Sequence, residues 1–197
     1  MPAPPPANLV LASTSPYRRT LLERLRIPFA TATPNVDETA LKDESPEALC
    51  ARLAAAKAQA VQRDWPDALI IGSDQVAVVD SVLLNKPGNH VNAVDQLRRM
   101  RGKAVNFFTA LCVLNARTTR RQTVIVPVTV HMRELSDVEI ERYLQAERPY
   151  DCAGSARIES LGITLVARLE CDDPTALIGL PLIELSAMLR NEGIDLP

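Results

Sequence analysis

Apolar positions along this chain follow two periods, one typical of β-strands and the other of amphipathic α-helices. Short continuous apolar runs predict buried strands. Two longer runs, rich in β-branched and aromatic residues, predict an antiparallel pair joined by the polar turn 115–121. The six segments predicted as strands are residues 9–12, 29–33, 68–72 with an extended continuation to 79, 104–114, 122–132 and 162–169.

Helices are predicted where capping residues precede apolar positions that are three or four residues apart. Ser15-Pro16 and Ser45-Pro46 each combine a good N-cap with proline at the first helical position. Ser136 and Glu139 form a capping box before a helix that extends to about residue 146. Two more helices are predicted, one over residues 91–98 that stops at Gly102 and one over 181–191 with Gly193 at C′.

This mixture of elements predicts an α/β fold with a mixed, partly antiparallel sheet flanked by helices. The 197 residues, 47% of them hydrophobic, are enough for a single well-buried domain over residues 8–197, and no internal repeat or long linker interrupts it. Residues 1–7 contain four prolines and are expected to form a flexible tail.

The charge balance excludes several kinds of partner. A formal net charge of −2 and a pI near 5.8 argue against binding to a nucleic-acid polymer or an anionic membrane, because both need a basic excess. No apolar run approaches the roughly 20 residues that cross a bilayer, so no membrane association is expected. The N-terminus also lacks the charged and apolar regions of a secretory signal.

Cysteine and histidine usage limits the metal and redox chemistry. The cysteines at positions 50, 112, 152 and 171 never form C-x-x-C, so a zinc site or a redox motif is not expected. Scattered thiols indicate a cytoplasmic location, and most of them are expected to fill the core. With only two histidines, at positions 90 and 131, any metal is expected to be Mg²⁺ or Mn²⁺ held by oxygen ligands.

The start of the first helix carries charges of the wrong sign for stability. Arg18 and Arg19 lie in its first turn, where the peptide dipoles already give partial positive charge. A bound anion, held by hydroxyls, free backbone N–H groups and the guanidinium groups, would remove this conflict. Taken alone, the pair is equally consistent with two solvated arginines on a surface helix.

Several short motifs, each weak alone, span nearly the whole chain from residue 9 to about residue 189. They are Ser13-Thr14-Ser15-Pro16-Tyr17-Arg18-Arg19, Val36-Asp37-Glu38-Thr39, Lys57-Ala58, Ile71-Gly72-Ser73-Asp74-Gln75-Val76, Asn85-Lys86-Pro87, and Cys152-Ala153-Gly154-Ser155 with Glu159. In type and order they resemble the motifs of the Maf family of nucleoside triphosphate pyrophosphatases. The resemblance implies a two-lobed body with a central cleft, shared with inosine triphosphate pyrophosphatases.

The resemblance also implies roles for the acidic residues. Asp74 follows an apolar strand and matches the proton acceptor of the family, and Glu38 with Asp74 matches ligands of a divalent cation, expected to be Mg²⁺ or Mn²⁺. The residues alone leave other interpretations open, in which Asp74 caps a turn after Gly72 and Glu38 belongs to an acidic turn.

Polar residues of several motifs are expected to bind the phosphates of a substrate. A lone lysine is more often solvated than bound, but the matched motifs favour phosphate binding. The residues assigned to the phosphates are Ser13, Ser15, Arg18, Arg19, Lys57 and Lys86.

Three positions, Tyr17, Gln75 and Glu159, concern the base. The residues Gln75 and Glu159 resemble the branch of the family that acts on 7-methyl-GTP rather than the branch that acts on dTTP and UTP. Glu159 is expected to accept hydrogen bonds from guanine, and Tyr17 to offer an aromatic face to the cationic methylated ring. That branch often has tryptophan where Tyr17 stands. The residues alone also allow a surface-packed Tyr17 and a solvated Glu159.

These motifs predict a hydrolase that cuts between the α and β phosphates of 7-methyl-GTP and releases pyrophosphate, with water as the nucleophile. One alternative is a pyrophosphatase for another nucleotide, such as dTTP, UTP or a modified nucleotide. Another is a regulatory module that binds nucleotides without turnover. The partner is in each case a small nucleoside triphosphate, and the family also implies a possible homodimer.

Overall fold

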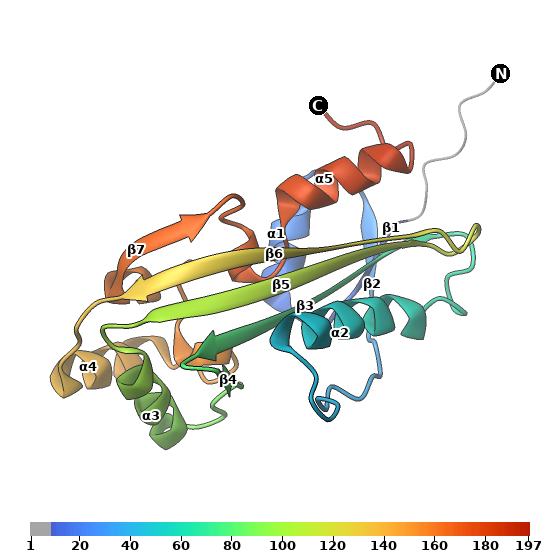
Figure 1. Cartoon of the computed structure of the whole chain (residues 1–197). Helices are drawn as coiled ribbons and strands as arrows, with labels where there is room; N and C mark the ends of the chain where they lie inside the picture. Colours follow the sequence, from blue (N-terminus) through green and yellow to red (C-terminus); the bar gives the residue numbers. More distant parts are fainter. Residues whose placement is uncertain (1–8) are drawn as a thin grey trace.

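The computed structural model describes residues 9–197. The strands of this part of the chain form one open, seven-stranded sheet (Figure 1). Six strands follow the order β2-β1-β3-β5-β6-β7, and β4 pairs with β3. β1 is parallel to β2 and to β3, whereas the other pairings are antiparallel. The predicted α/β class with a mixed, partly antiparallel sheet is therefore confirmed.

The elements have the following bounds. The strands are β1 (Leu9–Ala12), β2 (Phe29–Ala32), β3 (Leu69–Val79), β4 (Val82–Leu84), β5 (Ala104–Asn115), β6 (Arg121–Met132) and β7 (Val166–Cys171). The helices are α1 (Pro16–Glu23), α2 (Pro46–Ala60), α3 (His90–Met100), α4 (Asp137–Glu147) and α5 (Leu182–Asn191), with 3₁₀ turns η1 (Ala153–Ser155), η2 (Leu161–Leu165) and η3 (Ala176–Ile178). The predicted tail over 1–7 lies outside the described residues, and the single domain over 8–197 stays a prediction.

The predicted helix caps are present. The Oγ atoms of Ser15 and Ser45 accept the backbone N–H groups of Arg18 and Ala48, and Ser136 forms the capping box with Glu139. Each side chain satisfies an N–H group that has no partner within its helix. These local bonds fix where α1, α2 and α4 begin.

Alternating side chains give the β1–β3 half of the sheet two cores. Val10 and Ile70 pack beneath α2, whereas the neighbouring Leu11 and Ile71 pack with α1 and α5 on the opposite face. Successive residues of a strand point to opposite faces, so a continuous apolar run serves both cores. Figure 1 shows α2 on one side of this half and α1 with α5 on the other.

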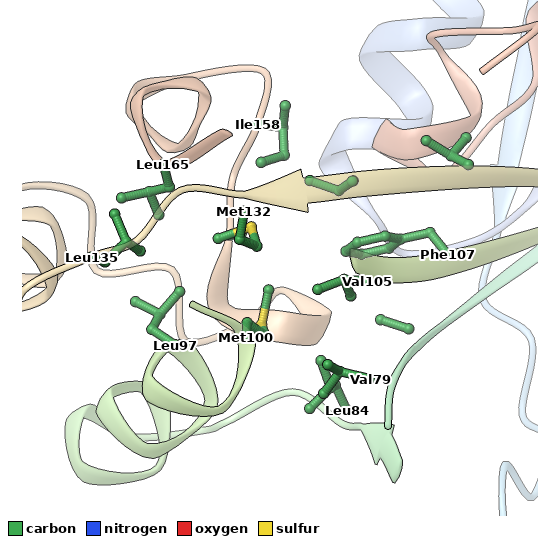
Figure 2. Close-up of a cluster of buried hydrophobic side chains, with 14 of the residues drawn as sticks. Val79, Leu84, Leu97, Met100, Val105, Phe107, Met132, Leu135, Ile158 and Leu165 are labelled. Atoms are coloured by element: carbon green, nitrogen blue, oxygen red, sulfur yellow. The ribbon is translucent and has the colours of Figure 1, made fainter. Parts of the chain in front are cut away.

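A third core lies at the other end of the long strands, beside α3 and α4. Leu97 and Met100 of α3 meet Phe107 of β5 and Leu165 of η2 there (Figure 2). This third core forms one lobe, and the two cores around β1 form the other. The predicted two-lobed arrangement is therefore confirmed.

The predicted strand over residues 162–169 is wrong in its first half. η2 occupies Leu161–Leu165, and β7 begins only at Val166. The backbone N–H of Gly162 donates to the carbonyl oxygen of Arg157 at 2.9 Å. A side chain at Gly162 would place its Cβ 2.4 Å from that oxygen, so this tight local turn excludes a strand there.

The cysteines only partly fit their predicted place in the core. All four are free thiols, and Cys50 and Cys112 are buried, but Cys152 is half-buried and Cys171 is exposed. The expectation that most of them fill the core is therefore wrong for two of the four. None of the helices between residues 9 and 197 combines the length and apolarity that crossing a bilayer requires.

Candidate active site

A cavity of about 340 Å³ lies where the two lobes meet. We call residues 13–18, Glu38 and Lys57 its first wall, and residues 151–159 its second wall. The predicted site residues that line the cavity are Ser13, Ser15, Tyr17, Arg18, Glu38, Lys57, Gln75, Lys86 and Glu159. Asp74 and Arg19 are not among the lining residues.

The turn between β1 and α1 brings hydroxyl groups to the start of a helix. Ser13 is buried and its Oγ accepts the backbone N–H of Ser15 at 3.1 Å. Ser15 Oγ in turn accepts the N–H of Arg18 at 3.4 Å. The turn thus places the positive end of the α1 dipole at the cavity, where it favours an anion.

The two adjacent arginines of α1 occupy different environments. Arg18 is half-buried, and its Nε donates to the carbonyl oxygen of Gly179 at 2.9 Å. Gly179 has φ of +112°, and a Cβ there would lie 3.3 Å from Arg18 Nε, so glycine suits this close approach. Burial lowers the pKa of Arg18, while the charges of Asp74 and Glu38 oppose the change. Arg19 instead pairs with Glu23 at 3.1 Å, with 64% of its side chain exposed.

Close packing of α2 on β3 brings Lys57 next to Asp74. A Cβ at Gly72 would lie only 2.1 Å from the carbonyl oxygen of Ala54, so glycine lets the helix approach the strand. Lys57 Nζ contacts Asp74 Oδ1 at 2.6 Å and Glu38 Oε1 at 2.7 Å. One buried ammonium group therefore joins two carboxylates from distant segments of the chain.

The two carboxylates on Lys57 differ in their proton affinity. Burial raises the pKa of Asp74, although the charges of Lys57 and Arg18 oppose this effect. Burial also acts on Glu38, but its hydrogen bond to Lys57 and the nearby charges of Lys57 and Lys86 bring its pKa below the ordinary value. Asp74 is thus the better proton acceptor of the two.

The carboxamide of Gln75 is fixed by the segment around η3. Its Nε2 donates to Thr109 Oγ1 at 2.9 Å and to the carbonyl oxygens of Ala176 and Leu177, each at 3.0 Å. These bonds use the N–H groups of Gln75 Nε2 within the protein. Within residues 9–197 no hydrogen bond involves Gln75 Oε1, and Gln75 lines the cavity. The residue therefore has an acceptor to offer to a ligand.

Tyr17 is tied to the second wall through its hydroxyl. The hydroxyl donates to Asp151 Oδ2 at 3.1 Å and accepts from Arg157 Nη2. The guanidinium carbon of Arg157 lies 5.2 Å from the ring centroid, in a cation–π contact. Burial, followed by the charges of Cys152 and Asp151, raises the pKa of Tyr17. The ring stays neutral and is held by residues more than 130 positions away in sequence.

Arg157 organises the second wall, although it was not among the site residues expected from the sequence. It pairs with Glu147 of α4 at 2.8 Å and with Asp151 at 3.3 Å. The only available signal was its place between the Cys152–Ser155 motif and Glu159. Glu159 is exposed at the cavity, and loss of hydration there raises its pKa, reinforced by the charges of Glu147 and Asp151.

Glu38 and Asp74 share the Lys57 ammonium group and carry oxygen atoms of the kind that Mg²⁺ and Mn²⁺ prefer as ligands. No group of three or more His, Cys, Asp or Glu side chains within residues 9–197 could hold a metal alone. Mg²⁺ commonly uses one or two carboxylates and takes its remaining ligands from phosphates and water. The pair on Lys57 therefore suits a cation that arrives with a phosphorylated ligand.

A cleft at the meeting of two lobes, with a helix N-terminus, cationic side chains and two carboxylates, defines a site of the class that binds phosphorylated ligands. Residues 8–192 match the family described as "Maf-like protein". The chain therefore belongs to the Maf family.

Relatives with similar sequences cover nearly the whole chain. A protein of Aromatoleum aromaticum is 58% identical over 191 residues, which are 97% of this chain and 98% of the relative. A protein of Methylobacillus flagellatus is 56% identical over 187 residues, with 95% and 97% covered. A protein of Cupriavidus pinatubonensis is 54% identical over 193 residues, with 98% and 97% covered. Each of the three is named 7-methyl-GTP pyrophosphatase.

Proposed function

We propose that this Maf-family protein is a nucleoside triphosphate pyrophosphatase that hydrolyses 7-methyl-GTP to 7-methyl-GMP and pyrophosphate. The observation that carries the proposal is the Glu38–Lys57–Asp74 cluster at one cavity that also contains Arg18, Lys86 and the start of α1. The full-length similarity to proteins of that name supports the choice of substrate.

In the proposed reaction, water attacks the α phosphorus. The bond between this phosphorus and the oxygen that bridges to the β phosphate breaks, and pyrophosphate leaves. Asp74 accepts the proton of the attacking water, and its raised pKa suits that role. Lys57, Lys86 and Arg18 neutralise the phosphate oxygens and stabilise the charge on departing pyrophosphate. Ser13, Ser15 and the N–H groups at the start of α1 complete the phosphate site.

A divalent cation held by Glu38 and Asp74 is part of the proposal. Mg²⁺ or Mn²⁺ would withdraw charge from the phosphate oxygens and so make the phosphorus more electrophilic. Lys57 holds the two carboxylates on one ammonium group and favours their ionised forms, which are the forms that bind a cation.

Recognition of the base is assigned to the far end of the cavity. Glu159 accepts the N1–H and exocyclic NH₂ groups of guanine, and Gln75 Oε1 offers a further acceptor. Tyr17 presents its ring to the base. Arg157 already lies over one face of that ring, so the base uses the face that Arg157 leaves open. A carboxylate at the base also favours the positive charge of N7-methylguanine.

The test is a screen of the purified protein against canonical and methylated triphosphates, with Mg²⁺ or Mn²⁺ and with EDTA. We expect pyrophosphate and a nucleoside monophosphate in equal amounts, fastest with 7-methyl-GTP, and no release with EDTA. Fastest turnover of dTTP, UTP or another nucleotide would contradict the substrate assignment. Binding of nucleotides without any release would contradict catalysis and favour a regulatory module.

We also propose that the protein is cytoplasmic, forms a homodimer and binds neither nucleic-acid polymers nor membranes. A nucleotide substrate and four free thiols suit a reducing compartment. Light scattering of the purified protein distinguishes a dimer from a monomer.

A further inference from the structure

Lys86 depends on its backbone for its position. It lies in the turn between β4 and α3, and it lines both the active-site cavity and a second hollow of about 410 Å³ beside α3. Its side chain is exposed, and no ion pair within residues 9–197 involves its ammonium group. The position of the Lys86 ammonium group relative to a ligand therefore depends on the contacts that hold this turn.

Two carboxamides of α3 hold the turn from both sides of Lys86. Gln96 Nε2 donates to the carbonyl oxygen of Asn85 at 2.8 Å, and Asn92 Nδ2 donates to that of Pro87 at 2.9 Å. The next N–H group, of Gly88, donates to the carbonyl oxygen of Tyr150 at 3.0 Å. The Asn85–Lys86 and Pro87–Gly88 peptide groups are thus tied to α3, and the second of them also to the segment that enters the second wall.

Gln96 is itself fixed by a buried residue of the second wall. Ser155 is fully buried, and its Oγ donates to Gln96 Oε1 at 2.7 Å. The carbonyl of Asn85 can only accept, so the NH₂ group of Gln96 must face it and the oxygen must face Ser155. Ser155 has φ of +56°, a left-handed conformation that is uncommon outside glycine.

We infer that Gln96 is a positioning residue for Lys86. We call the two hydrogen bonds from Ser155 to Gln96 and from Gln96 to Asn85 the relay. The relay fixes the turn that carries Lys86 relative to the second wall. The Lys86 charge, which binds the phosphates, therefore keeps a fixed distance from the residues that contact the base. The inference rests on the proposed function only for the identity of the ligand. It also gives the Cys152-Ala153-Gly154-Ser155 motif a physical task, because Ser155 begins the relay.

The test replaces Gln96 by methionine, which keeps the length of the side chain and removes both hydrogen bonds. We expect KM for 7-methyl-GTP to rise about 5- to 30-fold, the scale of one or two lost hydrogen bonds, with kcat changed less than about threefold. Gln62→Met is the matched control, since Gln62 Nε2 also donates to a backbone carbonyl, that of Ala116, away from the cavity. The control should stay within about twofold of the unmodified protein.

A double-mutant cycle with Lys86→Ala shows whether Gln96 acts through Lys86. Once the ammonium group is gone, Gln96→Met should change KM less than about twofold. An equal effect in both backgrounds, or an effect no larger than that of the control, would overturn the inference. Ser155→Ala provides a second variant with an intact glutamine if Gln96→Met unfolds, and it should also raise KM.

Calorimetry with an α,β-methylene analogue of GTP separates this inference from the proposed function. The analogue is not hydrolysed between these phosphates, so its Kd reports the phosphate site without turnover. We expect Gln96→Met to weaken its binding in the Lys86 background and not in the Lys86→Ala background. That pattern without any pyrophosphate release would support the relay and contradict the proposed function, whereas release with unchanged analogue binding would overturn the relay alone.

Discussion

The two walls of the cleft are built in different ways. The first wall lies mainly at the ends of regular elements, with Ser13 and Ser15 in the β1–α1 turn and Lys57 on α2, and only Glu38 comes from a longer loop. The second wall, residues 151–159, contains only the short turn η1, and ion pairs around Arg157 hold it. Under the proposed function, the first wall supplies most of the contacts to the triphosphate common to all substrates, and the second wall supplies Glu159, which reads the base together with Tyr17 and Gln75.

The largest expected effect comes at Asp74, which contacts Lys57 of the first wall. Asp74→Asn keeps the shape of the side chain but removes the proton acceptor, so turnover should fall on the order of 10²–10⁴-fold. Thermal unfolding should be nearly unchanged, since Lys57 keeps Glu38 as a partner. Steady-state pyrophosphate release on several triphosphates measures the loss. Near-normal turnover of any good substrate would remove Asp74 from the mechanism.

The adjacent arginines of α1 provide a matched pair, because Arg18 belongs to the first wall and Arg19 does not. Arg18→Ala should reduce kcat/KM about 10- to 150-fold, the scale of lost hydrogen bonds to a charged ligand, because Arg18 lines the cavity. Arg19→Ala should change it less than about threefold, since Arg19 is exposed and pairs only with Glu23. The assignment of Arg19 to the phosphates stays a prediction, and a loss equal to that of Arg18 would support it.

Most of the first wall, and of the elements that support it, could be predicted because the causes are local in sequence. The caps at Ser15 and Ser45 follow from short-range hydrogen bonds, and the buried strand before Asp74 follows from its apolar run. The close approach of Lys57 to Asp74 depends on Gly72, whose role becomes visible only when α2 is seen packed on β3. The sequence therefore indicated the residues but not the ammonium group shared by the two carboxylates.

The second wall could not be predicted in the same way. Its bonds join residues far apart, as between Tyr17 and Asp151, and no periodicity reports such contacts. The expected strand from residue 162 failed because Gly162 turns back onto Arg157. Three 3₁₀ turns and the short strand β4 were also missed within the described residues, since segments of three to five residues have little periodic signal.

A substitution in the second wall should reduce the selectivity between substrates rather than turnover in general. Glu159→Gln keeps the length of the side chain, removes its charge and replaces one acceptor oxygen with a donor. A hydrogen bond left unmade once the base covers Glu159 costs roughly 1–3 kcal/mol, so kcat/KM for 7-methyl-GTP should fall about 5- to 150-fold. UTP hydrolysis by the same variant should fall much less or rise. Equal losses on both substrates would show that Glu159 does not read the base.

The smallest expected effect is a pH-dependent change in selectivity, which separates the walls without a mutation. Loss of hydration at the cavity raises the pKa of Glu159 above its ordinary value of 4.5, and burial raises that of Asp74 above its ordinary value of 3.8. As the pH falls through these raised values, each carboxylate gains a proton. Protonation of Asp74 removes the proposed base and slows every substrate alike, so it cancels in the ratio of kcat/KM for 7-methyl-GTP to that for UTP. Protonation of Glu159 weakens only the guanine contacts, so this ratio should decline toward acid pH.

Glu159→Gln is the control for this measurement, because a carboxamide does not titrate and its ratio should stay flat over the same pH range. The acid limb in kcat for UTP should persist in Glu159→Gln, since Asp74 is untouched. If the ratio declines equally in the variant, a group other than Glu159 sets the selectivity. The protonation state of Glu159 would then have no part in reading the base.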